Sequence, residues 1–286
     1  MPDPSLATPI LTIGDHSRDS AGLRYVYPVV SRRAGGVSVG INLNPNNACN
    51  WRCIYCQVPN LRRGGPPPID LARLEHELEA MLDDILVGDF LTRRVPEAQR
   101  RLIDIAFSGN GEPTSSAEFP QAVELAAGAL IRRKLLPGVK LRLITNGSLL
   151  DRRSTRLGIA RIGEIDGEVW FKVDAADGRA IARVNGVRLK PASVERRLRQ
   201  CGQLCPTWVQ TCLFALDGQL PAKEEIDALV EFLGRCRNAV RGVHLYGLAR
   251  PSAQAEAPRL QTASAEWLKE VAARLEEKGL TVDVSP

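Results

Sequence analysis

The sequence predicts an α/β fold in which about six strand–helix units form a partial, open (β/α)6 barrel. Apolar, strand-like runs alternate with amphipathic stretches along most of the 286 residues. This alternation favours parallel strands joined by right-handed helical crossovers. Six units are too few to close an eight-stranded barrel. We expect one large domain, with residues 1–36 as an N-terminal extension that packs on a barrel formed by residues 37–286.

The individual elements follow from hydrophobic periodicity. Strands are predicted at residues 37–43, 102–107, 139–145, 168–174, 208–215 and 243–248. The clearest helices are predicted at residues 71–86, 117–133, 223–237 and 265–278. In the first helix, Leu74, Leu78 and Leu82 fall on one face at helical spacing. In such folds the chemistry collects at the C-terminal ends of the strands, where the connecting loops converge.

Composition and charge are those of an ordinary globular protein, with 44% hydrophobic and 25% charged residues. No stretch approaches the roughly 20 apolar residues of a membrane helix, and residues 1–15 lack a signal-peptide pattern. We therefore expect a cytoplasmic protein without a membrane partner. The net charge of +5 and several arginine pairs, among them Arg62 and Arg63, are compatible with an RNA partner. A solvated, arginine-rich helical exterior is the favoured alternative.

The loop after the first predicted strand carries three cysteines, Cys49, Cys53 and Cys56, in a C-x3-C-x2-C spacing. Seven cysteines in total and this tight cluster argue for metal or redox use rather than a disulfide framework. Three local thiolates can hold a [4Fe–4S] cluster and leave one iron without a protein ligand, open to a small chelating molecule. A structural zinc site and an electron-carrying ferredoxin, which normally use four ligands, are the alternatives.

This cysteine spacing after the first strand, with Tyr55 directly before the last cysteine, resembles the radical S-adenosylmethionine superfamily. The resemblance extends over roughly residues 37–248. It implies a partial (β/α)6 barrel and a [4Fe–4S] cluster that cleaves S-adenosylmethionine to a 5′-deoxyadenosyl radical, which abstracts hydrogen from a substrate. It also implies an electron donor such as flavodoxin or ferredoxin.

Two further motifs agree with this resemblance. Gly109, Asn110, Gly111 and Glu112 follow the second strand and resemble the family's G-G-E segment, in which the carboxylate accepts from the cofactor's ammonium group. Asn146, in a T-N-G sequence after the third strand, lies where the family binds the ribose. Tyr55 is expected to contact the cofactor as well. Each glycine-rich segment taken alone could be an ordinary turn.

The predicted lumen carries the candidate catalytic residues Lys172, Asp174 and His244. A lysine and an aspartate on the inner face of a parallel strand are costly to bury unless they are paired or functional. His244 is a candidate proton donor or substrate contact, or a structural histidine. Gln210 and Cys212 on the fifth strand are also expected to face the lumen.

A lead-in at residues 27–43, together with the K-x-D-A sequence at residues 172–175, is similar to the wyosine-forming tRNA synthases within that superfamily. Those synthases attach a two-carbon unit from pyruvate to a tRNA base and hold a second cluster on upstream cysteines. This chain has no cysteine before Cys49. The alternatives are therefore a tRNA-modifying enzyme of this type and a non-catalytic iron–sulfur or RNA-binding module. The remaining cysteines could hold a second cluster or be buried apolar residues: Cys201, Cys205, Cys212 and Cys236.

Overall fold

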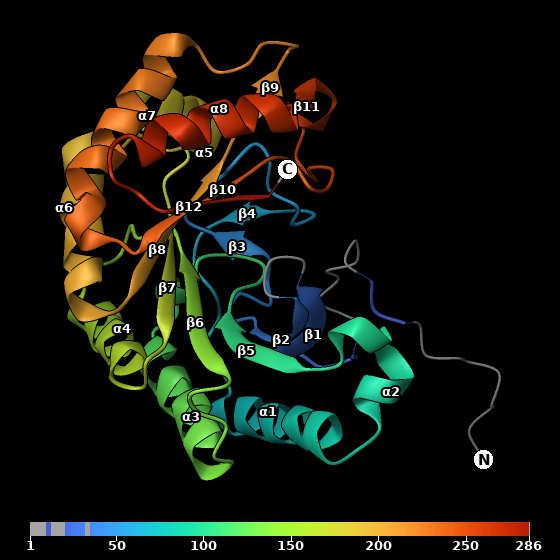
Figure 1. The fold of residues 1–286 in the computed structure, drawn as a ribbon. Coiled ribbons are helices and arrows are strands. Elements are labelled where there is room, and N and C mark those ends of the chain that lie inside the picture. The colour runs from blue at the N-terminus through green and yellow to red at the C-terminus, as the bar shows by residue number, and fades with distance from the viewer. Residues whose placement is uncertain (1–9, 13–20, 32–34, 286) are drawn as a thin grey trace.

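The computed structural model describes residues 10–12, 21–31 and 35–285 and contains a curled eight-stranded sheet, ordered β1-β2-β5-β6-β7-β8-β10-β12. Figure 1 shows the sheet curling around a concave side, with most helices on its convex side. Six parallel strands form its centre: β2 (Gly36–Ile41), β5 (Leu102–Phe107), β6 (Lys140–Thr145), β7 (Glu168–Lys172), β8 (Thr207–Cys212) and β10 (Gly242–Tyr246). The predicted partial barrel is confirmed.

Two strands that the sequence did not predict extend the sheet at its edges. β1 (Val26–Ser31) pairs antiparallel with β2, so part of the segment assigned to the N-terminal extension belongs to the sheet itself. β12 (Val282–Ser285) pairs parallel with β10. Both are edge strands, which pair with a neighbour on one side only. Such a position tolerates Pro28 in β1 and the short, half-polar sequence of β12. Arg32 and Arg33, which belong to the lead-in sequence, lie outside the described residues.

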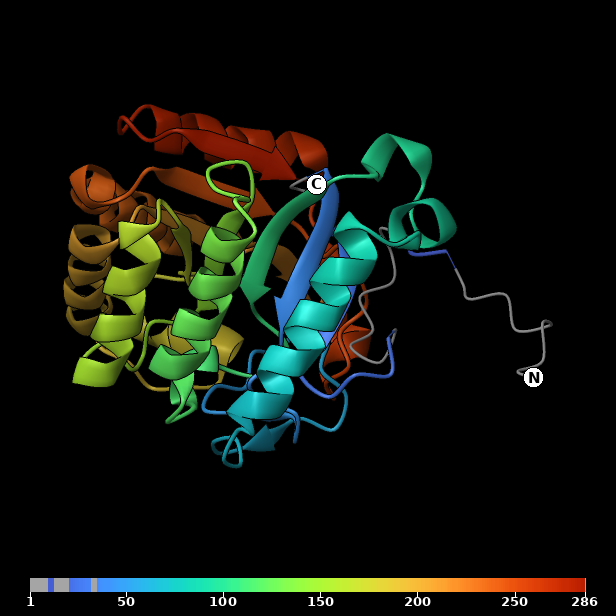
Figure 2. The same cartoon turned by 90° about the horizontal axis from the view of Figure 1, so that it is seen from below.

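The helices pack on the outer face in the order α1, α3, α4, α6, α7 and α8, each in contact with the next. Figure 2 shows the first of these, coloured cyan to yellow-green, running side by side in front of the sheet. α1 begins after Asp70, whose carboxylate accepts from the backbone N–H of Arg73, as a helix cap does. The main helices are α1 (Leu71–Leu86), α3 (Phe119–Arg132), α4 (Arg153–Glu164), α5 (Gly178–Asn185), α6 (Pro191–Leu204), α7 (Lys223–Cys236) and α8 (Ala265–Glu276).

Short elements complete the fold. They are α2 (Phe90–Arg94), η1 (Glu97–Gln99), η2 (Pro113–Ser115), η3 (Arg237–Ala239) and η4 (Ala257–Arg259), and two small sheets formed by β3 (Ala48–Cys49) with β4 (Arg62–Arg63) and by β9 (Phe214–Leu216) with β11 (Leu260–Thr262). No described helix is both long enough and apolar enough to cross a membrane.

The two faces of the sheet differ in polarity. On β6, Leu141 and Leu143 are fully buried and belong to the main core with the helices. Arg142 and Ile144, which alternate with them, line cavities on the concave side. Side chains alternate between the two faces along each strand. The concave face therefore forms a polar lumen, and the convex face forms an apolar core with the helices. The candidate site lies in this lumen.

Candidate functional site

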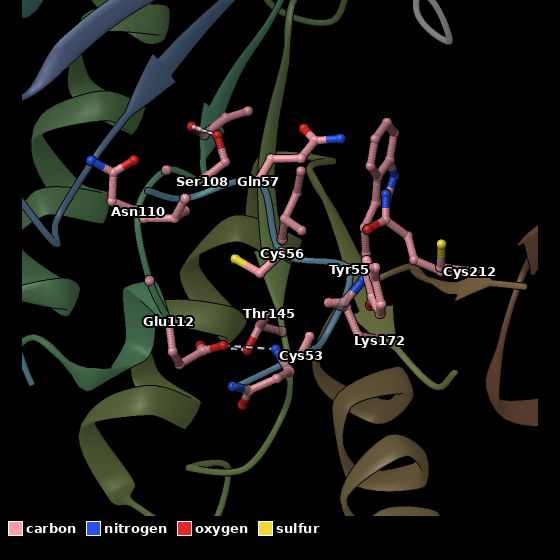
Figure 3. A pocket seen from close by; sticks show the side chains of 18 of the residues that line it. Cys53, Tyr55, Cys56, Gln57, Ser108, Asn110, Glu112, Thr145, Lys172 and Cys212 are labelled. Atoms are coloured by element: carbon pink, nitrogen blue, oxygen red, sulfur yellow. Dashed lines mark hydrogen bonds between the residues drawn. The ribbon is translucent and has the colours of Figure 1, made fainter. Parts of the chain in front are cut away.

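The three cysteines of the C-x3-C-x2-C loop lie together at the C-terminal end of the sheet and line one cavity of about 340 Å³. Figure 3 shows Cys53 and Cys56 in this cavity, with Glu112 and Thr145 to one side in the view and Tyr55 and Lys172 to the other. Each cysteine is partly exposed. The backbone N–H of Trp51 points at Cys49 Sγ (3.4 Å), and the side-chain amide of Asn185 points at Cys53 Sγ (3.3 Å). Such N–H···S contacts suit thiolate ligands.

The surroundings of these thiols disfavour their ionisation without a positive partner. Burial raises the pKa of Cys49 to about 11 and that of Cys53 to about 12. A metal ligand must be the thiolate, so a bound metal group would have to supply the compensating charge. Among the described residues, no three His, Cys, Asp or Glu side chains are close enough to hold one metal ion. Three thiols of one loop can each bind a different metal atom of a larger group, as the thiolate ligands of an iron–sulfur cluster do.

Two segments outside the cysteine loop hold it in position. Arg63 donates to the backbone carbonyls of Asn50 (2.6 Å) and Gly186. From the other end of the chain, Ser252 Oγ donates to the Ile54 carbonyl (2.8 Å), and Ala253 N donates to the Cys56 carbonyl (2.9 Å). Arg63, considered at the sequence level as an RNA contact, therefore has a structural role in this loop.

The G-N-G-E segment packs directly against the cysteine loop. A Cβ atom added to Gly111 would overlap the carbonyl oxygen of Ala48 and the side chain of Asn44. Asn42 is 3% exposed, and its Oδ1 accepts from the backbone N–H groups of Asn44 (3.0 Å) and Asn110 (3.1 Å). These buried asparagines couple the two motifs. In the sequence, only the richness in asparagine at residues 42–47 indicated that Asn42 and Asn44 have a special role.

Replacing Gly111 by Ala should therefore lower the free energy of unfolding by about 1–3 kcal/mol, because the added methyl group overlaps backbone atoms. Chemical denaturation of the metal-free chain would measure this loss. Gly65→Ala is the matched control, since no atom lies within 4 Å of the added Cβ, and it should change stability by less than about 0.5 kcal/mol. Equal stability of the two variants would contradict the close packing of these loops.

Glu112 is 3% exposed and connects two strand ends. Its Oε1 accepts from Thr114 Oγ1 and Thr145 Oγ1 (both 2.6 Å), and its Oε2 accepts from the backbone N–H of Asn146 (2.7 Å). Burial raises the pKa of Glu112, against the lowering effect of these hydrogen bonds. The carboxylate lines the cavity and also holds the two strand ends together. Thr114 was missed from the sequence, and Thr145 was identified there only as part of the T-N-G motif.

The other proposed cofactor contacts line the same cavity: Tyr55, Gly109, Asn110, Gly111 and Asn146. Asn146 Nδ2 donates to Asn50 Oδ1 in the cysteine loop (2.9 Å), and Asn110 Nδ2 donates to Asn47 Oδ1 (2.7 Å). Gly147 has a φ of +67°, and a Cβ there would overlap the Phe171 ring. The T-N-G sequence thus forms a tight turn that brings Asn146 to the cysteine loop.

Asp174 is the centre of a buried network between the cysteine loop and the lumen. Its carboxylate accepts from Tyr55 Oη (2.5 Å), Asn185 Nδ2 (2.7 Å) and the backbone N–H of Cys212 (3.0 Å). Lys172 Nζ lies 3.8 Å from it. Asn185, at the end of α5, thus contacts both Asp174 and Cys53, and no sequence pattern identified it.

Lys172 lines the cavity between two tyrosines. Its Nζ donates to Tyr246 Oη (3.0 Å) and lies 5.1 Å from the centre of the Tyr55 ring. Burial alone would lower the pKa of Lys172, but the nearby Asp174 carboxylate and Tyr246 hydroxyl outweigh burial and raise it. The side chain is therefore a cation near neutral pH, suited to electrostatic contact rather than to nucleophilic attack.

His244 lies lower in the lumen, beside a second cavity of about 360 Å³. Its ring stacks on Trp208 at 4.6 Å, and its Nδ1 lies 3.3 Å from Asp283 Oδ2. It is not among the residues lining the cavity that contains the cysteines. Trp170 and Arg142 line both cavities, so the two adjoin. A catalytic role for His244 stays a prediction.

The four remaining cysteines are buried away from the cysteine loop or beside its cavity. Cys201, Cys205 and Cys236 belong to the main core, whereas Cys212 packs with Ile54 and Phe214 beside the cavity. Burial raises the pKa of Cys201 to about 12 and that of Cys236 to about 11. These positions suit small apolar side chains.

Comparison with known structures identifies the fold. The chain is similar to TYW1 in a structure with a lysine–pyruvate adduct bound (TM-score 0.58, 18% identity, 85% of this chain and 74% of that chain). It is also similar to a radical SAM methyltransferase from Sphaerobacter thermophilus (TM-score 0.55, 14% identity, 91% and 68%). The chain thus has the fold of radical SAM enzymes.

Sequence comparison gives weaker and shorter matches, and no family model matches the chain. UPF0026 protein MJ1312 from Methanocaldococcus jannaschii is 30% identical over 164 residues, which cover 55% of this chain and 42% of that protein. A protein named GTPase Obg from Brachyspira hyodysenteriae is 30% identical over 132 residues, covering 45% of this chain and 16% of that protein. The chain spans less than half the length of these curated relatives.

Proposed function

We propose that this chain, which has the fold of radical SAM enzymes, is itself a radical SAM enzyme. It would bind a [4Fe–4S] cluster through Cys49, Cys53 and Cys56 and S-adenosylmethionine in the cavity beside them. One observation supports this most strongly: the three thiols and the Glu112 carboxylate, from loops after different strands, line one cavity at the C-terminal end of a partial barrel. This is the end at which ligands of such folds bind.

The residues present fit both groups. Three thiols from one loop, with N–H donors at two of the sulfurs, suit a cluster that keeps one iron free of protein ligands. When bound, the cluster and S-adenosylmethionine would supply the reductive cleavage that starts hydrogen abstraction. Glu112 would face the cofactor's ammonium group, and Asn146 its ribose. Gly247, Leu248 and Ala249, which line the cavity after β10, offer backbone contacts to a planar base.

The protein's own contribution is binding, orientation and exclusion of water. Asp174 fixes the Tyr55 ring and, through Asn185, the Cys53 side chain. Ser252 and Ala253 close the outer side of the cysteine loop. A rigid, enclosed site of this kind keeps a reactive intermediate from side reactions. An electron donor such as flavodoxin or ferredoxin would then approach from outside the loop.

The direct test is cleavage of S-adenosylmethionine. Anaerobically reconstituted protein with dithionite should form 5′-deoxyadenosine and methionine, measured by mass spectrometry. Cys53→Ala should abolish this product, because the cluster would lose one of its three ligands. Cys236→Ala, at a buried cysteine outside the site, should retain it. No 5′-deoxyadenosine from protein that carries a cluster would refute the proposed function.

A second candidate is a tRNA-modifying reaction of the wyosine type, favoured by the similarity of the fold to TYW1 and by the lead-in sequence at residues 27–43. Of the arginines near the cysteine loop, Arg63 holds backbone carbonyls and Arg52 lies 3.9 Å from Glu256. Arg62 is exposed and is the better position for an RNA contact.

If RNA is the substrate, Arg62→Glu should weaken tRNA binding, and the affinity of the unaltered protein should fall by roughly 0.7–0.9 log units per phosphate contact for each tenfold rise in salt. Filter binding at several salt concentrations measures both effects. Lys134→Glu is the control, because Lys134 is exposed between α3 and the start of β6, at the opposite end of the strands from the cysteine loop. Undetectable tRNA binding at low salt, or equal effects of both reversals, would favour a small-molecule or peptide substrate.

A further inference from the structure

A row of polar side chains crosses the inner face of the sheet below the cysteine loop. Lys172 on β7 is in register with Gln210 on β8, which is in register with His244 on β10. Neighbouring residues in register on a sheet lie about 4.8 Å apart. Lys172 and Gln210 also line the same cavity as the three cysteines. Two side chains with N–H donors are therefore adjacent in the lumen.

Gln210 has an unfilled hydrogen-bonding capacity. The residue is 2% exposed, and its Nε2 is a buried nitrogen without a hydrogen-bond partner among the described residues. Buried amide groups are nearly always paired, because an unpaired donor loses its hydration without compensation. An unpaired glutamine amide at a cavity wall is better explained by an acceptor on a bound ligand than by packing. A leucine would fill the same space without the free-energy cost of burying an unpaired donor.

The hydrogen-bonding capacity of the Lys172 ammonium group is also only partly used. An ammonium group has three N–H donors; one is directed to Tyr246 Oη, and Asp174 at 3.8 Å lies beyond hydrogen-bonding distance. The Asp174 carboxylate is already bound by Tyr55 and Asn185. The cation therefore keeps donor capacity on the cavity side, next to the unpaired amide of Gln210.

We propose that Lys172 and Gln210 form a subsite for a singly charged carboxylate of the substrate, adjoining the place of the cofactor. This inference rests on the proposed function and specifies its substrate class. The two oxygens of a carboxylate match one donor from each strand. A phosphate dianion would bring a second negative charge close to Asp174. Arg142, another cation that lines the cavity, is already paired with Asp104 and Glu168.

The subsite is testable without cleavage chemistry. The probes are propionate and its neutral isostere propionamide, titrated into the full chain carrying ¹⁵N in its glutamine side chains and followed by NMR. The resonance pair of Gln210 is identified by its loss in Gln210→Leu. We expect a saturable shift of this pair with propionate and an affinity at least about tenfold lower for propionamide, since a charge-assisted hydrogen bond is lost.

Substitutions separate a binding role from a structural one. Gln210→Leu should abolish propionate binding, detected by ligand saturation transfer, while leaving the chain at least as stable, because it removes a buried unpaired amide. Lys172→Met should weaken propionate binding about tenfold or more. Gln203→Leu, at an exposed glutamine of α6, should bind propionate as the unaltered chain does.

Three outcomes would overturn the subsite: equal binding of propionate and propionamide, propionate binding that survives Gln210→Leu, or inorganic phosphate binding more tightly than propionate at Gln210. Because binding is measured without reductant, these outcomes are distinct from a failure of the proposed function. If the chain binds propionate at Gln210 but never forms 5′-deoxyadenosine, the proposed subsite is supported and the proposed enzyme activity is refuted.

Discussion

Removal of the Asp174 carboxylate is expected to destabilise the folded protein by about 3–5 kcal/mol, the range found when one partner of a buried ion pair is deleted. The Asp174 side chain is fully buried and lies 3.8 Å from the Lys172 ammonium group, which is itself 17% exposed. Asp174→Ala would leave this cation without its counter-charge. It would also leave Tyr55 Oη, Asn185 Nδ2 and the Cys212 N–H without their acceptor. Chemical denaturation of the metal-free chain measures the loss.

The double variant Lys172→Met/Asp174→Ala is the matched control, because it removes both charges. It should recover part of the stability lost in Asp174→Ala, as replacing a buried pair by apolar side chains is often close to neutral. A double variant less stable than Asp174→Ala would show that the cation is not the source of the cost. The network described at the base of the cysteine loop would then be wrong.

The second large effect is expected at Glu112. Glu112→Gln keeps the size of the side chain and removes its charge, so it should lower the affinity for S-adenosylmethionine by about one to two powers of ten while the cluster still assembles. Glu112→Ala also deletes the acceptor for Thr114, Thr145 and Asn146, and should reduce stability in addition. Equilibrium dialysis with labelled S-adenosylmethionine, together with iron analysis, separates the two effects.

Glu97→Gln provides the control, since Glu97 is exposed in η1 and does not line the cavity. It should bind the cofactor with unchanged affinity. If Glu112→Gln also binds S-adenosylmethionine like the unaltered protein, the carboxylate serves only to hold the strand ends together. The assignment of the G-N-G-E segment to the ammonium group would then fail.

The sequence predicted the fold where periodicity was strong. The helix at residues 71–86 and the strand at residues 102–107 have the predicted bounds, because their apolar spacing is regular and α1 begins at a capping aspartate. α4 and α6 were not among the clearest predicted helices, since each buries only a narrow apolar face among many arginines. The edge strands β1 and β12 were missed because edge positions tolerate proline and polar residues.

The site could be predicted only in part. Motifs contiguous in sequence, such as the cysteine triad and the G-N-G-E segment, identified residues that line one cavity. Asn185 and Ser252 could not be found, because each contacts the cysteine loop from a segment more than a hundred residues away and has no local pattern. The unpaired amide of Gln210 is likewise a property of packing, which only the structure reveals.

The most direct test of the proposed site is the electron paramagnetic resonance spectrum of the reduced protein. Anaerobically reconstituted chain should contain about four irons, and its reduced cluster signal should shift when S-adenosylmethionine is added, because the iron without a thiolate ligand binds the cofactor. In the Cys53→Ala variant both the iron and the shift should be lost. One zinc per chain without iron uptake, or a cluster signal unchanged by S-adenosylmethionine, would contradict a three-thiolate cluster with an open iron.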